Sequence, residues 1–155
     1  MNYEDAGPKL GEEQAARFEN ATNSFISDEH RSFLLTVTNG GYPVERLTIP
    51  TEDCVGGAGT LHGVYGIDHP NPLYNLSEAA DNLACPLTEL IPFGFDDGTG
   101  QLFIDMVRLP GRVVYAPYEE LDDRPLVTYH VANSIREFFT LAQELTVELD
   151  EAESD

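Results

Sequence analysis

The sequence has few positive charges, which limits its partners. Only eight of its 155 residues are Lys or Arg, against 28 Asp or Glu, so the formal net charge is −20. A field of this sign repels phosphate, which makes nucleic acid and anionic membranes poor partners and a basic protein a favourable one. Acidic surfaces also confer solubility or adapt proteins to a salty cytoplasm. The charge alone therefore leaves a binding role and a solubility role open.

The sequence also has few cysteines and no long apolar run. Cys54 and Cys85 lie far apart, so a disulfide framework is not required; we interpret both as free thiols, although they could pair. The opening residues lack the basic and apolar regions of a signal peptide. No apolar run approaches the roughly 18–20 residues that cross a bilayer. We therefore expect a cytoplasmic protein.

What is present suits a single folded domain. A chain of 155 residues can bury roughly 70% of its extended surface without a disulfide or metal. Hydrophobic residues make up 41% of the chain, which argues against global disorder. We expect a flexible leader at 1–11, one domain at 12–145, and a frayed or disordered acidic tail at 146–155.

The stretch LIPFGFDDGTGQLFID at 90–105 predicts a β-hairpin. Apolar and aromatic β-formers precede DDGTG, where Asp and Gly favour a reversal of the chain, and a second strand begins near Leu102. A hairpin cannot stand alone in water and needs further strands or a helix on its apolar face. We therefore expect it at the centre of the fold.

The remaining pattern is that of an α+β domain. Good caps, acidic first turns and apolar residues three and four apart predict helices, and partly alternating runs predict short strands. Helices are expected at 12–20, 28–38, about 75–82 and 131–145, and strands at 42–50, 61–67, 112–116 and 126–129.

Motifs for phosphate or metal binding are not formed. The glycine-rich loop at 56–59 lacks the Lys of a phosphate-binding loop, and the turn at 96–100 lacks the spacing of a calcium loop. None of the four histidines forms an HxH or HxxxH pair, and although Asp68 and His69 could supply two ligands, the sequence indicates no third. We expect no metal and no cofactor.

Nothing in the sequence indicates catalysis. There is no G-x-S-x-G elbow, and neither cysteine has a recognisable nucleophile signature. We expect a protein that is not an enzyme. A small-molecule binder or enzyme that uses the loop at 56–60 with His62 or His69 remains an open third hypothesis.

Several short segments occur in the order and spacing of a known family. An acid-bearing helix with Glu19 leads to FISDEHRSFL at 25–34, which is similar to the family pattern LP-x-x-Y-x-x-F-L, and then to the turn NGG at 39–41. The other segments are VYGI at 64–67, LIPFG at 90–94 with DGTG at 97–100 and FID at 103–105, VVY at 113–115, and VANSIREFF at 131–139.

Together these segments resemble the SUKH superfamily, which includes the yeast Smi/Knr cell-wall-synthesis regulator and many bacterial immunity proteins. The resemblance covers about residues 12–145. Two positions depart from the pattern: Ser27 or Asp28 stands where a Pro is usual, and Ala116-Pro117-Tyr118 stands where a Trp is frequent.

The resemblance implies a central, mostly antiparallel sheet flanked by N-terminal helices and a C-terminal amphipathic helix. It also implies a non-enzymatic role. Bacterial members commonly bind and neutralise a cognate polymorphic toxin domain, often a nuclease. The alternative is a regulatory or scaffold interaction module of the same fold, since fold does not fix function.

An acidic inhibitor can occupy the basic cleft of a nuclease, which suggests where the contact surface lies. We expect acidic loops at the hairpin tip and after the strand at 112–116, with tyrosines as anchors because interface hot spots favour Tyr, Trp and Arg. The candidate partner-binding residues are Asp96, Asp97, Tyr118, Glu119, Glu120, Asp122, Asp123 and Tyr42.

Overall fold

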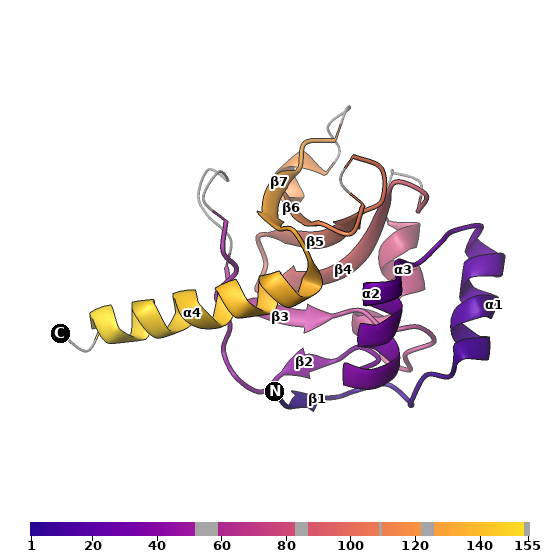
Figure 1. Ribbon diagram of the computed structural model, residues 1–155, viewed down its shortest axis with the longest axis horizontal. Coiled ribbons are helices and arrows are strands. Elements are labelled where there is room, and N and C mark those ends of the chain that lie inside the picture. The colour runs from indigo at the N-terminus through magenta and orange to yellow at the C-terminus, as the bar shows by residue number, and fades with distance from the viewer. Residues whose placement is uncertain (52–58, 83–86, 109, 122–125, 154–155) are drawn as a thin grey trace.

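The fold is α+β, as predicted, with a five-stranded antiparallel sheet and a separate two-stranded sheet. Figure 1 shows helix α4 crossing the strands beside α2, with its C-terminal half extending beyond the body. The computed structural model describes residues 1–51, 59–82, 87–108, 110–121 and 126–153.

The larger sheet has the strand order β3-β4-β5-β6-β7, so every strand pairs with its neighbours in sequence. The predicted hairpin at 90–105 is confirmed as β4 and β5, and β5 is the middle strand. Ile91 of β4 pairs with Ile104 of β5, and β4 is buried along its whole length. The strands are β3 (Leu61–Val64), β4 (Leu90–Asp96), β5 (Gly100–Asp105), β6 (Val113–Pro117) and β7 (Tyr129–Ala132).

The first residues do not form the loose leader that we expected. Strand β1 (Tyr3–Glu4) pairs antiparallel with β2 (Tyr42–Pro43). The Tyr3 ring meets the Phe33 ring edge-on, with centroids 6.3 Å apart, and Leu10 is buried. Isolated apolar side chains therefore anchor this segment, and they form no period that a sequence pattern reveals. The strand expected at 42–50 is only two residues long.

The predicted helices are confirmed in position and differ at their ends. Ser27 caps α2, because its hydroxyl accepts from the His30 N–H, and the chain leaves the following helical turn through Gly40 and Gly41 at positive φ. The helices are α1 (Glu12–Thr22), α2 (Asp28–Ser32), the π-helical turn η1 (Phe33–Val37), the 3-10 turns η2 (Pro72–Tyr74) and η3 (Tyr118–Glu120), α3 (Leu76–Asp81) and α4 (Ile135–Glu153).

The last part of the chain differs most from expectation. The strand expected at 126–129 lies at 129–132 as β7, so residues 131 and 132 belong to a strand and not to the start of the helix. Helix α4 continues to Glu153, where we expected a frayed acidic tail from 146. Thr146 explains the extension. Its buried hydroxyl donates to the Ala142 carbonyl at 2.7 Å and accepts from the Thr48 N–H at 2.8 Å. The helix is thus tied to the segment after β2, a long-range contact that composition does not reveal.

The first turn of α4 is capped from two places. The Ser134 hydroxyl accepts from the Glu137 N–H at 3.0 Å. The Glu29 carboxylate of α2 accepts from the N–H groups of Ile135 and Arg136, at 2.8 and 3.3 Å. Free N–H groups at a helix start need such acceptors, so α2 completes α4.

An aromatic cluster joins the helices to the sheet. Phe93 of β4 is fully buried, and its ring lies 5.5 Å from Phe33, 5.9 Å from Phe138 and 6.2 Å from Phe139. Edge-to-face pairs of this kind stabilise a core beyond their burial alone. Phe93 therefore links the central hairpin to η1 and α4.

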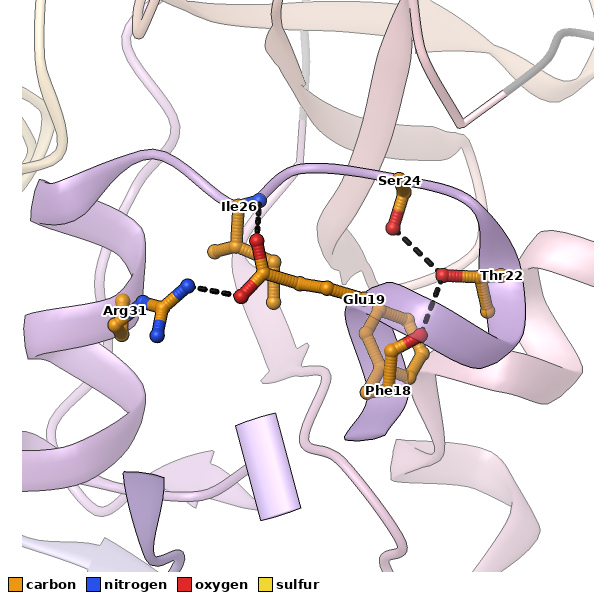
Figure 2. Close-up of polar contacts among 6 residues, drawn as sticks. All are labelled: Phe18, Glu19, Thr22, Ser24, Ile26 and Arg31. Carbon is orange, nitrogen blue, oxygen red and sulfur yellow. Dashed lines mark hydrogen bonds and ion pairs between the residues drawn. The ribbon is translucent and has the colours of Figure 1, made fainter. Parts of the chain in front are cut away.

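A second link joins α1 to α2. Figure 2 shows the Glu19 carboxylate between the two helices, where it accepts from the Ile26 N–H at 3.1 Å and forms an ion pair with Arg31. The hydroxyl of Thr22, the last residue of α1, lies 2.6 Å from the Ser24 hydroxyl in the loop that follows. Glu19, the acid noted in the sequence, therefore fixes the connection between the helices.

Candidate functional site

The turn between β4 and β5 is organised by one carboxylate. Asp96 Oδ1 accepts from the backbone N–H groups of Gly98 at 3.1 Å, Thr99 at 2.7 Å and Gly100 at 2.9 Å. Gly98 supplies the positive φ, 123°, that the turn requires. The local chemistry that predicted the turn therefore also determines its shape.

The other oxygen of Asp96 is equally engaged. Oδ2 accepts from the Tyr115 hydroxyl at 2.6 Å, from the Gly59 N–H at 3.2 Å and from the Thr99 hydroxyl. Asp96 is only 2% exposed, although we expected an exposed acid at the hairpin tip. That expectation is corrected because the carboxylate points inward to these donors, which leaves it no surface for a partner.

The pKa of Asp96 reflects this environment. Burial raises it, but the hydrogen bonds from Thr99, Tyr115 and the Gly100 N–H outweigh burial, so the pKa lies below its ordinary value. Asp96 therefore stays ionised in the folded protein. A buried carboxylate can do so when several donors replace its water.

Three of the predicted residues lie together at one end of the sheet. Asp97 is exposed at the hairpin tip and accepts from the Thr60 N–H at 3.3 Å. Tyr118 begins η3 beside this turn, since its N–H donates to the Thr99 carbonyl at 2.9 Å. Glu119 follows and is exposed. The end of the sheet therefore presents two carboxylates and a tyrosine.

The other predicted residues have different positions. Glu120 is half-buried, and its Oε1 accepts from the Tyr129 hydroxyl at 3.1 Å. Tyr42 lies on the two-stranded sheet, where its hydroxyl donates to Glu4 at 2.5 Å, so the structure does not bring it to the hairpin tip. Asp122 and Asp123 lie outside the described residues.

Tyr118 forms one wall of a small hollow, which we call the Tyr118 notch. The notch has a volume of about 200 Å³. Its rim carries exposed apolar groups, since Leu73 is 51% and Tyr118 41% exposed. Its lining comes from η2, α3 and its C-cap residue, strands β4 and β5, η3 and the residue that follows β3: Tyr65, Pro72, Leu73, Glu78, Ala79, Asn82, Phe95, Gln101 and Tyr118.

Polar groups lie at the floor of the notch. Gln101 donates from Nε2 to the Tyr65 hydroxyl at 3.0 Å. Burial raises the pKa of both Tyr65 and Tyr118, the charge of Asp96 adds to the rise at Tyr118, and hydrogen bonding to Gln101 opposes it. Both hydroxyls therefore stay neutral. The notch thus offers aromatic faces and uncharged polar groups.

Of the residues that line the notch, the sequence analysis named Tyr118 as a candidate and none of the others. Leu73 and Glu78 come from a turn-rich segment and a short helix, whereas Gln101 lies on β5. The one local signal is Leu73, an apolar residue in the turn-rich segment DHPNPLY. It does not indicate which residues lie opposite it in the fold. These residues meet only through the tertiary fold.

A larger hollow, which we call the α2–α4 groove, lies elsewhere. Its volume is about 460 Å³ and its walls are mostly apolar. None of the predicted residues that the structure describes lines it, and the Glu29 carboxylate on its edge is already engaged in capping α4. The lining residues are Met1, Tyr3, Glu29, Ser32, Phe33, Val37, Ile135, Arg136, Phe139, Thr140 and Gln143.

In the part of the chain that the structure describes, no group of three or more His, Cys, Asp or Glu side chains is arranged so that it could hold a metal ion. His69 is engaged through both ring nitrogens, with the Asp5 carbonyl at 2.7 Å and the Asn71 N–H at 3.0 Å. Among the same residues no helix is long and apolar enough to cross a membrane. Cys54 and Cys85, whose pairing stayed open, lie outside the described residues, as does most of the loop at 56–60.

Comparison with known protein families shows which family the chain belongs to. Residues 9–141 match the SMI1/KNR4 family (SUKH-1). The chain belongs to this family. The match confirms the resemblance that the ordered segments from Glu19 to the VANSIREFF helix predicted, and it covers most of the chain. No curated protein matches the chain significantly.

Proposed function

We propose that this SUKH-1 protein is an immunity protein that binds and neutralises a cognate polymorphic toxin domain of the nuclease type. The observation that carries the proposal is the family match over 9–141, because bacterial members of the superfamily are commonly immunity proteins. The net charge of −20 supports it, since a nuclease presents a basic cleft.

The proposed mechanism is stoichiometric binding and not catalysis. Asp97 and Glu119 are exposed and lie with Tyr118 at one end of the sheet, where the Tyr118 N–H donates to the Thr99 carbonyl of the hairpin turn. Acidic groups around an aromatic anchor steer a basic partner to the surface and then hold it through contact in the centre. In a nuclease cleft these carboxylates would take the places of phosphates.

The test is a binding and protection assay with the toxin domains encoded beside the gene. The full chain is mixed with each purified toxin domain, and complex formation is measured by calorimetry at low and moderate salt. We expect a 1:1 complex whose affinity falls as salt rises, and rescue of cells that express the toxin. Absence of both binding and rescue for every neighbouring toxin would overturn the proposal.

The regulatory or scaffold role is the other outcome of the same test. It predicts no toxin or secretion gene beside this one, and a pull-down from lysate of the source strain that retains no single basic protein. A single basic protein that elutes as salt rises supports the inhibitor and identifies its target.

A further inference from the structure

We infer that the Tyr118 notch receives an arginine side chain from the basic partner. This inference rests on the proposed function, because that function supplies a basic partner. It assigns a recognition role to Glu78, Gln101 and Leu73, and it makes Tyr118 the wall of a pocket and not an isolated anchor.

The volume of the notch is suited to a single side chain. Pockets for small ligands enclose about 300–1,000 Å³, and the notch has about 200 Å³. It is therefore too small for a nucleotide or cofactor, and a single long side chain fits it. The exposed apolar atoms of Leu73 and Tyr118 at its rim would cover the aliphatic stem of such a side chain.

The charge of the notch selects a cation. Glu78 of α3 is exposed and lies on the lining, and no hydrogen bond or ion pair is made to its carboxylate within the described part of the chain. No Lys or Arg among the described residues lines the notch. The described residues thus form a pocket suited to a cation and contribute no cation to its lining.

The aromatic walls favour arginine over lysine. Tyr65, Phe95 and Tyr118 all line the notch, and a guanidinium stacks on such rings while its planar fork binds a carboxylate with two hydrogen bonds. The neutral Tyr65 and Tyr118 hydroxyls and the Gln101 amide supply further acceptors. A lysine ammonium is more strongly hydrated and gains less from the rings.

The first experiment probes the notch without any toxin. Labelled full-length protein is titrated with N-acetyl-arginine amide and, separately, with N-acetyl-lysine amide, and chemical shifts are followed by NMR. We expect the arginine probe to give saturable shifts at the Gln101 side-chain amide and at the Ala79 and Asn82 N–H groups, with weaker shifts for lysine. Equal responses to the two probes, or shifts spread evenly over the acidic surface, would overturn the inference.

Variants then assign the effect to named groups. Tyr118→Ala and Glu78→Gln should each weaken binding of the arginine probe at least about tenfold. Leu149→Ala and Glu148→Gln on the projecting half of α4 are the matched controls, since both residues are exposed, and should bind as the wild type does. Thermal unfolding of each variant verifies that it is folded. Loss of affinity in the controls as large as in the notch variants would contradict the inference.

The final arm separates this inference from the proposed function. A toxin domain that the wild type binds should bind Tyr118→Ala and Glu78→Gln at least about tenfold more weakly. If the notch variants bind that toxin as tightly as the wild type, the notch inference fails and the immunity function stands. If the wild type binds no toxin but takes the arginine probe, the immunity function fails and the notch remains a site for arginine.

Discussion

Asp96 and His30 are two buried ionisable groups that the fold treats in opposite ways. Asp96 is 2% exposed and is surrounded by hydrogen-bond donors, whereas His30 is 0% exposed, and neither of its ring nitrogens has a partner among the described residues. Burial removes water from both groups. The difference shows that the partners which replace water, and not burial itself, decide whether a group stays charged.

Asp96 and His30 accordingly have different structural roles. Asp96 remains ionised and holds the hairpin turn, because donors from Thr99, Gly100 and Tyr115 outweigh burial. Burial lowers the pKa of His30 to about 4, so its ring is neutral at pH 7. The ring meets Phe93 edge-on at 5.7 Å. His30 therefore fills core volume as an aromatic ring does.

Their pKa values also place their effects in different pH windows. Above about 6.5 His30 is neutral in both states; as the pH falls toward 4, the unfolded chain gains a proton that the folded protein does not take up, and stability is lost. The stabilisation from Asp96 is present above its ordinary pKa and is lost as the pH falls through its lower folded value. Acid should therefore weaken the fold in two steps.

The largest effect is expected from removing the carboxylate. Asp96→Ala leaves the Tyr115 hydroxyl and the N–H groups of the turn without their acceptor, so we expect a loss of about 3–5 kcal/mol in the free energy of unfolding. Urea denaturation at pH 7 measures it. A loss below about 1 kcal/mol would show that the turn is held by other contacts.

The second-largest effect is the loss of stability that His30 causes between pH 6.5 and 4, which a substitution of His30 should abolish. Wild-type stability should fall by about 3 kcal/mol at most between pH 6.5 and 4 because of His30. His30→Leu should be neutral or stabilising at pH 7, since it removes an unpartnered polar ring from the core, and should lack this step. Urea denaturation at pH 7, 5.5 and 4.5 compares the two. An unchanged step in the variant would assign it to another group.

A smaller effect tests the contribution of one donor. Tyr115→Phe removes the hydroxyl that donates to Asp96 at 2.6 Å, and we expect a loss of about 1–3 kcal/mol. Because one cause of the low pKa of Asp96 is gone, the lower acid step should begin at a higher pH. Tyr42→Phe, which removes a hydroxyl bond to Glu4 in an exposed position, is the control and should change stability less.

The smallest effect on stability is expected from a substitution of Asp97, the next residue of the turn. Asp97 is exposed and accepts only from the Thr60 N–H at 3.3 Å among the described contacts. Asp97→Asn should change the free energy of unfolding by less than about 0.5 kcal/mol. Urea denaturation of the two variants, Asp97→Asn and Asp96→Ala, under the same conditions compares their free energies of unfolding. A loss comparable with that of Asp96→Ala would erase the distinction between the two aspartates.

The turn could be predicted from the sequence, but the direction of Asp96 could not. DDGTG has the local chemistry of a reversal. Which aspartate points inward depends on the register of β4, and the register shifts between Pro92 and Gly94. Since β4 is buried throughout, no alternation of polar and apolar residues marks its inner face.

His30 shows the opposite case, a signal that was present in the sequence. It precedes the apolar residues Phe33, Leu34 and Val37 by three, four and seven positions, which is the spacing of one helix face. The family segments and the hairpin were predicted for the same reason, because local patterns carry them. The Tyr118 notch and the length of α4 depend on contacts between distant segments, which a single sequence does not display.

The cap that Glu29 provides for α4 has a consequence for the order of folding. The cap and the helix it completes lie 106 residues apart, and a ribosome makes Glu29 long before it makes Ile135. Bringing such distant residues together is slow compared with forming a local turn. Helix α4 should therefore gain its full first turn only after α2 has docked on the sheet, so a peptide of α4 alone should be less helical at that end than the same segment in the protein.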